Sequence, residues 1–417
     1  MFNFLTYKSL KNRKFTSFLC VLSIALSVTL FLGIERIRNG AREGFTNTIS
    51  KTDLIIGAKG GSLQLLLYTV FHLGSAVNNI KMSTYQDIIK NPQVEWAIPI
   101  SLGDAYRGFR VVGTDENFFK HYQFRGDKKV SFAQGQLPVD TFDVVIGSEI
   151  AKKFNHKVGD PIVIAHGISS VSLMNHDSTP FKITGILNPT QTPIDTAVYI
   201  TLQGMEAIHF GWETGVPSGE TINPDRFKKE NIEITQLTSF MVKLKSRLAV
   251  LRIRRLIDQY EAEPIMAIIP ALSLQEMWET ISYVEQVLYI VSLFVLIGGM
   301  ISILIALYTS INERRREMAI LRSLGARAPH VFLLLLYESS LLVFSGCLLG
   351  VLSLYGAIVI IKPWLESNFS IYLPIEMLSK TELTYLVLIF IAGSLAGIIP
   401  AIKAYLNSLQ DGLTIKI

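Results

Sequence analysis

Residues 15–34 read FTSFLCVLSIALSVTLFLGI and carry no charged side chain. A helix needs about 20 apolar residues to cross the hydrocarbon core of a bilayer, and this run has that length. Three more apolar runs lie near the C-terminus, at residues 287–310, 331–361 and 383–402. We therefore expect four transmembrane helices, with a long insert between the first and the second.

The insert, residues 35–285, is too polar and too mixed in pattern to lie in lipid. Hydrophobic residues make up 49% of the 417-residue chain, and its mean hydropathy is +0.37. These values are high for a soluble enzyme and low for a transporter made only of helices, as expected of a chain divided between lipid and water. The insert is large enough to build its own hydrophobic core, which we expect to form two lobes.

Strand and helix patterns alternate from Val94 onward, which predicts an extracytoplasmic α/β domain. The expected strands are 109–113, 144–146, 161–164, 181–186, 197–200 and 240–244, and the expected helices are 149–154 and 249–260. Residues 35–50 and 271–285 should be stalk helices that continue the first two spans, with the glycines of 57–61 breaking the first stalk. The apolar segment 63–71 favours a buried helix over a surface that touches lipid or cargo.

The distribution of cations predicts the orientation in the membrane. The net charge is +5, and many of the cations lie next to the spans. Membrane orientation explains these cations better than nucleic-acid binding does. Residues 1–14 carry four cations among apolar residues, which predicts an amphipathic surface helix before an uncleaved anchor rather than a signal peptide. Loop 312–330 has five arginines, whereas loop 362–382 has two lysines. We therefore expect the N-terminus, loop 312–330 and the tail 403–417 in the cytoplasm. The insert and loop 362–382 then lie outside.

The insert shows no recognisable catalytic motif. The two cysteines, Cys20 and Cys347, lie in apolar runs, so no disulfide framework holds the insert together. His156, His166 and His176 are widely spaced and are expected to be loop or surface residues rather than a zinc site. No HExxH, GxSxG or CxxC pattern occurs. We therefore expect no catalytic, cofactor-binding or metal-binding residue in this chain.

Residues 313–326 read ERRREMAILRSLGA and follow the second span on its cytoplasmic side. A positive-inside anchor would explain the arginines. It would explain neither Glu317 nor the presence of apolar residues in a short exposed loop. A helix that docks into a groove on a cytoplasmic partner explains both, and Gly325 is a suitable helix stop. The residues expected at this docking surface are Glu313, Arg314, Arg315, Arg316, Glu317, Ile320, Leu321, Arg322 and Gly325.

This segment resembles the cytoplasmic coupling helix of the MacB/FtsX-type ABC transporter permeases, a group that includes the lipoprotein-releasing permeases. Other segments that resemble the family are VIGSEIAKKF (145–154), VGDP (158–161), FKITGIL (181–187), PID (193–195), VYI (198–200) and GIIPAIKA (397–404). Together they cover most of the chain. The resemblance implies a MacB-like periplasmic core domain inserted between the first two transmembrane helices.

The resemblance also implies a function. Such a permease sits in the bacterial inner membrane as a homodimer and works by mechanotransmission, without passing cargo through the bilayer. Two copies of a cytoplasmic ABC ATPase close the cytoplasmic ends of the dimer, and the stalks carry that motion to the periplasmic domain. That domain then extrudes or releases a cargo, which the sequence does not identify. A periplasmic adaptor or substrate-binding protein is a further partner that this layout allows, and nucleic acid is not expected.

ATP and magnesium are expected on the partner ATPase, so this chain is not expected to be an enzyme. A P-loop needs the pattern GxxxxGK[ST], because backbone amides and a lysine must surround the phosphates. The nearest candidate, Gly57–Ser62, lacks that spacing and lies on the outer side of the expected topology.

Small residues at four-residue spacing predict close helix packing within the spans. Gly346 and Gly350 form one such pair, and Gly393 and Gly397 form another. Gly298, with Ser302 four residues on, offers the same spacing in the second span. Packing within one subunit and packing between two subunits both remain open for these positions.

Two other functions remain as alternatives. An FtsX-like, non-transport regulator would use its outer domain to activate a periplasmic cell-wall hydrolase, and a membrane-anchored enzyme would catalyse a reaction outside the cytoplasm. The large insert argues against the first alternative, and the missing catalytic groups argue against the second.

Overall fold

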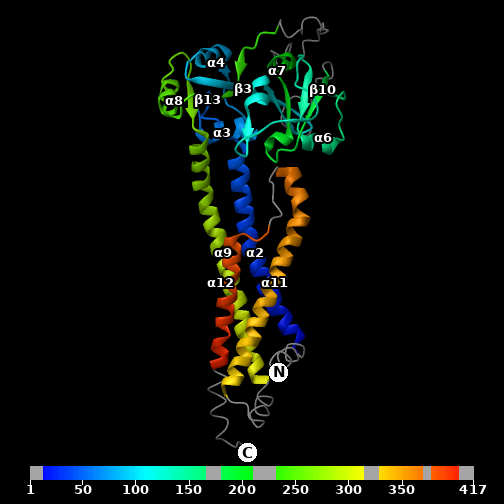
Figure 1. Cartoon of the computed structure of the whole chain (residues 1–417), viewed down its shortest axis with the longest axis vertical. Helices are drawn as coiled ribbons and strands as arrows, with labels where there is room; N and C mark the ends of the chain where they lie inside the picture. The colour runs from blue at the N-terminus through cyan, green and yellow to red at the C-terminus, as the bar shows by residue number, and fades with distance from the viewer. Residues whose placement is uncertain (1–12, 166–179, 210–231, 314–327, 370–376, 403–417) are drawn as a thin grey trace, which may run out of the picture. The chain divides into compact units, whose positions relative to one another are not determined.

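The computed structural model describes residues 13–165, 180–209, 232–313, 328–369 and 377–402, and the following account concerns these residues. The chain divides into two units (Figure 1). The first, here called the helical unit, comprises Met1–Gly40, Ser282–Trp364 and Leu373–Ile417. The second, here called the sheet unit, comprises Ala41–Ile281 together with Leu365–Tyr372.

Four long helices contain segments that can cross a membrane. They are α2 (Lys14–Thr48), α9 (Pro270–Glu313), α11 (Ala328–Phe369) and α12 (Lys380–Ala396). The segments long and apolar enough to span are Lys14–Gly44, Pro270–Ser302, Phe332–Lys362 and Lys380–Ile402. The prediction of four transmembrane helices with an α/β domain between the first two is confirmed.

One predicted boundary was wrong. Helix α2 ends at Thr48, and the glycines of 57–61 do not break it, because residues 54–58 already form a strand. The third spanning segment ends at Lys362, close to the predicted residue 361, and α11 itself continues to Phe369, so the first residues of loop 362–382 are helical. Lys362 and Pro363 end the apolar run, and hydropathy therefore marks where lipid contact stops rather than where the helix stops.

Ten strands of the described residues form one mixed sheet. In spatial order, nine of them are β14 (Ile265–Ile268), β1 (Leu54–Ala58), β13 (Ser239–Leu244), β3 (Val94–Tyr106), β4 (Phe109–Thr114), β11 (Ala197–Thr201), β8 (Asp143–Ile146), β10 (Phe181–Leu187) and β7 (Phe132–Gly135). The tenth, β9 (Pro161–Ile162), pairs with β10. Two short hairpin-like pairs, β2 (Ile80–Lys81) with β12 (Gln236–Leu237) and β5 (Gln123–Phe124) with β6 (Lys128–Lys129), lie outside this sheet.

The long strand β3 joins two halves of the sheet. Its first part, Val94–Ile100, pairs with β13, and its second part, Ser101–Tyr106, pairs with β4. Strands β4 and β11 run parallel, as do β8 and β10, whereas the other neighbouring pairs are antiparallel. The strands predicted at 109–113, 144–146, 181–186, 197–200 and 240–244 are confirmed, and the strand predicted at 161–164 ends at Ile162.

Helices cover both faces of the sheet. They are α3 (Ser62–Phe71), α4 (Met82–Ile89), α5 (Glu116–His121), α6 (Ser148–Phe154), α7 (Leu202–His209) and α8 (Val250–Asp258), and short 3-10 turns occur at η1 (Pro193–Thr196) and η4 (Arg247–Ala249). Strand β1 shows how the faces are divided, because successive side chains of a strand point to opposite sides. Leu54 and Ile56 pack in a cluster with α4 and α8, whereas Ile55 packs in a cluster with α3 and α5.

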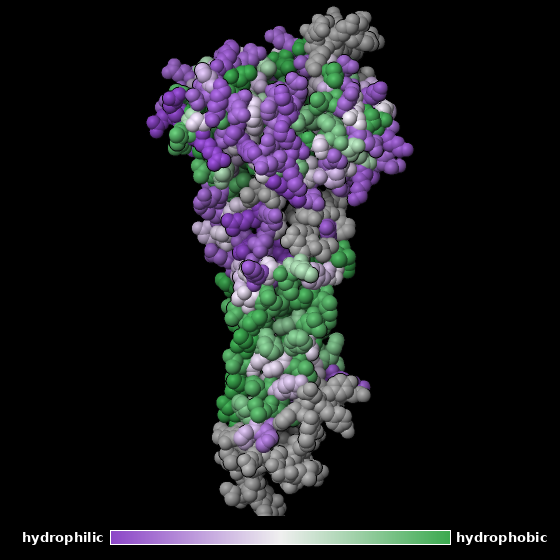
Figure 2. Space-filling model, in the orientation of Figure 1, coloured by the Kyte–Doolittle hydropathy of each residue, from purple (hydrophilic) through white to green (hydrophobic). Residues whose placement is uncertain are grey.

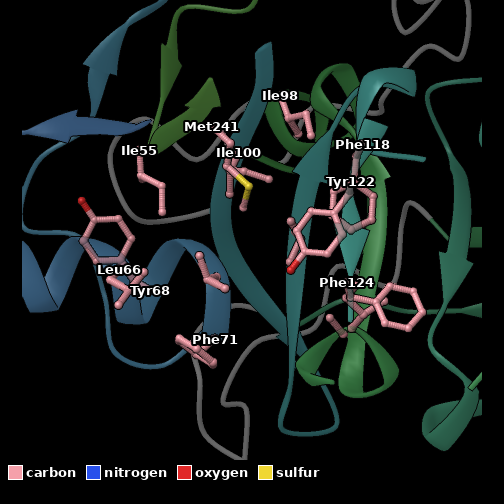
Figure 3. Close-up of a cluster of buried hydrophobic side chains, with 14 of the residues drawn as sticks. Ile55, Leu66, Tyr68, Phe71, Ile98, Ile100, Phe118, Tyr122, Phe124 and Met241 are labelled. Carbon is pink, nitrogen blue, oxygen red and sulfur yellow. The ribbon is translucent and has the colours of Figure 1, made fainter. Parts of the chain in front are cut away.

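The second cluster, which includes Ile55, extends across both halves of the sheet (Figure 3). It contains Leu66 of α3, Met241 of β13 and Phe118 of α5. The prediction that segment 63–71 is a buried helix is confirmed, because six side chains of α3 are buried. A third cluster joins β8, β10 and β11 to α6 and α7.

Asp115 caps helix α5 at a partly buried position beside strand β4. Its Oδ1 accepts a hydrogen bond from the backbone N–H of Asn117 at 3.0 Å, and its Oδ2 accepts one from Asn117 Nδ2 at 3.0 Å. Burial outweighs these bonds and raises the pKa of Asp115 from 3.8 to about 6. The native state therefore holds this proton more tightly than the unfolded chain does.

We expect Asp115→Asn to change the pH dependence of stability in the sheet unit. Asparagine is an equally good helix cap, so the substitution removes the titration and keeps the cap. The native carboxyl has the higher pKa, so its contribution to stability is lost as pH rises from about 4 to about 6. Over that range, the free energy of unfolding of the variant should rise relative to that of the wild type by up to about 3 kcal/mol. At higher pH the difference should stay constant. Hydrogen exchange of β3 and α5 amides in the full-length protein measures this gain. A difference that stays constant across the range would contradict it.

Candidate functional site

The surface of the helical unit is apolar over the transmembrane segments (Figure 2). Large apolar side chains point outward from all four helices, among them Leu26, Leu30, Phe294, Ile305, Phe344, Leu352, Val387 and Leu388. Soluble monomeric proteins rarely expose contiguous apolar patches larger than a few hundred Å². Lipid contact accounts for this surface.

The glycines predicted to pack the spans bring α2 and α11 together. A Cβ at Gly346 would lie 2.6 Å from Ile24 Cβ, and a Cβ at Gly350 would lie 2.7 Å from Val28 Cβ. Real side chains do not approach so closely, so only glycine permits this separation of the two helices. Thr29 adds polar contacts here, because its hydroxyl donates to the Gly350 carbonyl at 3.0 Å and contacts Ser353 Oγ.

The second glycine pair brings α11 and α12 together. A Cβ at Gly393 would lie 2.8 Å from Val343 Cγ2, and a Cβ at Gly397 would overlap Ser339. By contrast, Gly298 of α9 has no atom within 4 Å of where its Cβ would be. The neighbouring Gly299 approaches α2 instead, with Ser27 Oγ 3.1 Å from its Cβ position. Four of the five predicted glycines thus pack helices within this chain, and Gly298 faces open space.

A cluster of polar side chains, missed by the sequence analysis, lies at the end of the helical unit where α12 begins. We call Glu35, Arg36, Tyr289, Tyr355 and Glu382 the polar cluster. Arg36 Nε donates to Glu382 Oε1 at 2.7 Å, and Arg36 Nη2 reaches Glu382 Oε2 at 3.3 Å. The same Nη2 donates to the Tyr355 hydroxyl of α11 at 3.0 Å. The side chains of Arg36 and Glu382 are only 9% and 4% exposed.

Glu35, the residue before Arg36, makes the contact with α9. It is 2% exposed, and its Oε2 accepts a hydrogen bond from the Tyr289 hydroxyl. Its Oε1 accepts from Arg38 Nη2 at 3.0 Å and from Asn39 Nδ2 at 2.9 Å. One turn away, Phe31 packs edge-on against Tyr289 of α9 and Tyr385 of α12.

The first turn of α12 contributes Glu382 to the polar cluster, and the same residue helps to cap the helix. Ser379 caps the helix by accepting from the Glu382 N–H at 3.1 Å, and Glu382 Oε2 accepts from the Ser379 N–H at 2.7 Å. This is a capping box, and Ser379-x-x-Glu382 could have been recognised in the sequence. Arg36 and Arg38 were instead included in the stalk predicted at residues 35–50, because the sequence alone does not show which helices lie beside them.

The docking residues predicted in loop 312–330 lie almost wholly outside the described part of the chain. Arg314, Arg315, Arg316, Glu317, Ile320, Leu321, Arg322 and Gly325 lie outside the described residues, and Glu313 is the last residue of α9. The expected surface helix of residues 1–14 and the tail 403–417 also fall almost wholly outside them. The docking surface therefore stays a prediction.

The histidines of the insert are only partly described. His156 Nε2 lies 2.8 Å from the Tyr106 hydroxyl, and its Nδ1 lies 3.5 Å from Asp160 Oδ2. His166 and His176 fall outside the described residues. Within the described part of the chain, no three metal-ligating side chains gather at one point.

Comparisons with known proteins identify both parts of the chain. Residues 17–260 match the family model of the MacB-like periplasmic core domain, and residues 289–407 match that of the FtsX-like permease C-terminal region. No curated protein gives a significant match. A similar solved structure is the extracellular domain of the noncanonic ABC-type transporter YknZ from Gram-positive bacteria. It is 10% identical, and the alignment covers 52% of this chain and 98% of that chain with a TM-score of 0.30.

We expect Gly350→Ala to destabilise the helical unit. The added Cβ would meet Val28 Cβ at 2.7 Å and the Ala25 backbone oxygen at 2.9 Å, so α2 and α11 must separate. Overpacking of this kind costs about 1–3 kcal/mol. Thermal unfolding in detergent should show the loss as a lower midpoint. Gly356→Ala on the same helix is the matched control, because nothing lies within 4 Å of its Cβ position. Equal midpoints for the two variants would show that this close approach is absent.

Proposed function

Because the chain belongs to the MacB/FtsX-type ABC transporter permeases, we propose that it couples ATP hydrolysis by a separate cytoplasmic subunit to movement of its sheet unit. The ATPase binds at Glu313–Gly325, and no nucleotide binds to this chain. The sheet unit acts on a cargo on the outer side of the inner membrane. The observation that carries this proposal is the pair of family matches, since they place an outer-domain module and a permease module in one chain.

The helices support a mechanical coupling. Helix α9 has 44 residues and α2 has 35, whereas about 20 residues suffice to cross a bilayer. Both helices contribute residues to the helical unit and to the sheet unit without interruption. A displacement applied at one end of an unbroken helix moves its other end. Glu313 ends α9, so force received by the docking segment enters the same helix.

The sheet unit is suited to receive such a displacement. Its main sheet is hydrogen-bonded continuously from β14 to β7, and the cluster of Ile55, Phe118 and Tyr199 packs across both halves. A continuous sheet with a shared core moves as a body rather than deforming strand by strand. Cargo release and activation of a cell-wall hydrolase would use the same coupling step, and the identity of the outer partner distinguishes them.

We expect Glu317→Lys to abolish co-purification of the ATPase subunit and stimulation of its activity. Reversing this charge places a like-charged side chain among arginines and disrupts a docked helix. The measurement is pull-down from detergent extracts, with membrane insertion checked by extraction and size-exclusion chromatography. Glu233→Lys is the matched control, since Glu233 is an exposed acid of the sheet unit. Normal pull-down by Glu317→Lys would count against the docking surface.

The proposed orientation predicts which positions face the cytoplasm. In a chain with Cys20 and Cys347 replaced by alanine, Lys120→Cys should react with a membrane-impermeant maleimide in spheroplasts. Arg316→Cys should react only after the membrane is permeabilised. Lys120 is exposed on the sheet unit, so lack of access would not explain a failure to label. Labelling of both positions from the same side would overturn the topology.

A further inference from the structure

Two consecutive residues of α2 contact all three other transmembrane helices. Glu35 accepts a hydrogen bond from Tyr289 of α9, whereas Arg36 pairs with Glu382 of α12 and donates to Tyr355 of α11. Successive side chains of a helix point about 100° apart, which is why adjacent residues can reach different neighbours. The polar cluster is therefore a single junction of four helices.

The junction is built from charges that burial makes costly. Glu35 is 2% exposed, and the side chains of Arg36 and Glu382 are 9% and 4% exposed. A buried ion pair adds little net stability over well-packed apolar side chains, and its best-attested use is to fix one geometry. Ionisable residues within transmembrane segments are accordingly functional candidates. The stability of the helices alone does not explain why these groups are charged.

The junction is held by charged hydrogen bonds, unlike the small-residue contacts elsewhere in the bundle. Arg36 donates two hydrogen bonds to the Glu382 carboxylate, at 2.7 and 3.3 Å, so both the distance and the angle between the groups are fixed. Glu382 also closes the capping box with Ser379, so the same carboxylate holds the first turn of α12. By contrast, at Gly346 and Gly350 the two helices meet through van der Waals contacts and the uncharged hydrogen bond from Thr29 to the Gly350 carbonyl.

We propose that Glu35 and Arg36 are positioning residues that clamp α9, α11 and α12 to α2, so that the four helices move as one body at this end. The proposal deepens the coupling function proposed above and rests on it for the nucleotide-dependent part. In that cycle the junction transmits movement of α9 to α2, and both helices then displace the sheet unit together. Without the clamp, ATP would still be hydrolysed but the two helices would move separately.

The first experiment tests the clamp without nucleotide. We expect Arg36→Glu and Glu382→Arg, each alone, to speed hydrogen exchange of the first α12 amides by on the order of tenfold or more. The double exchange of both residues restores the pairing of α2 with α12 but not the cap, because an arginine at 382 cannot accept from the Ser379 N–H, so exchange should be slower than in Glu382→Arg alone. Glu382→Gln keeps a side chain that can cap the helix and removes the charge. Any change in exchange in this variant therefore reports the loss of the ion pair. Arg42→Glu is the control, because Arg42 is exposed on the same helix. Unchanged exchange in the single variants, or no recovery in the double variant, overturns the clamp.

The second experiment tests transmission. The permease and its ATPase are trapped with ADP and vanadate, and exchange is followed at residues 41–58 and 265–281. In the wild type these segments should respond to trapping. In Tyr289→Phe, which removes the hydrogen bond from α9 to Glu35, the response of 41–58 should be lost while 265–281 still responds and the ATPase still co-purifies. A full response of 41–58 in this variant, even with lowered thermal stability, would reduce the junction to a structural role and overturn the proposal. If the wild type gives no response, the coupling function fails, and the first experiment alone decides the clamp.

Discussion

The packing of α2 against the other three transmembrane helices is the interaction on which the helical unit depends. Lipid is as apolar as the side chains it surrounds, so helix association in a membrane must come from close van der Waals contact and hydrogen bonds. Helix α2 uses both. Ser27 contacts α9, Ile24 and Val28 fit against the glycines of α11, and Arg36 reaches α12. A residue change on α2 therefore affects several interfaces at once.

Strand β3 plays the corresponding part in the sheet unit. It is long enough to pair with β13 along one half and with β4 along the other, so both halves share its backbone hydrogen bonds. Two lobes were predicted from the size of the insert, and the halves have separate clusters on one face and a common cluster on the other. The lobes are therefore joined by sheet and core rather than by a linker.

Much of the fold could be predicted from the sequence, because hydropathy marks lipid contact and alternation marks half-buried strands. Strand β1 was missed, because Leu54, Ile55 and Ile56 are buried on both faces and show no alternation. The polar cluster was missed for a different reason. Glu35 and Arg36 look like stalk residues until α9, α11 and α12 are placed beside them, and no local pattern gives that placement. The glycine spacings predicted close packing but not its partners, since the spacing is the same within a subunit and between subunits.

The contrast between the two kinds of helix contact bears on how the bundle can move. The contact of Gly346 and Gly350 with Ile24 and Val28 loses little when one helix tilts along the other, because it is held by van der Waals contacts and one uncharged hydrogen bond, from Thr29 to Gly350. Arg36 and Glu382 are buried, so separating them would leave each charge without its partner, and that separation is much more costly. Movement along the Gly346 and Gly350 contact is therefore easier than movement at Arg36 and Glu382. In the proposed cycle we therefore expect the bundle to pivot about its polar end, while its glycine-lined contacts absorb the displacement.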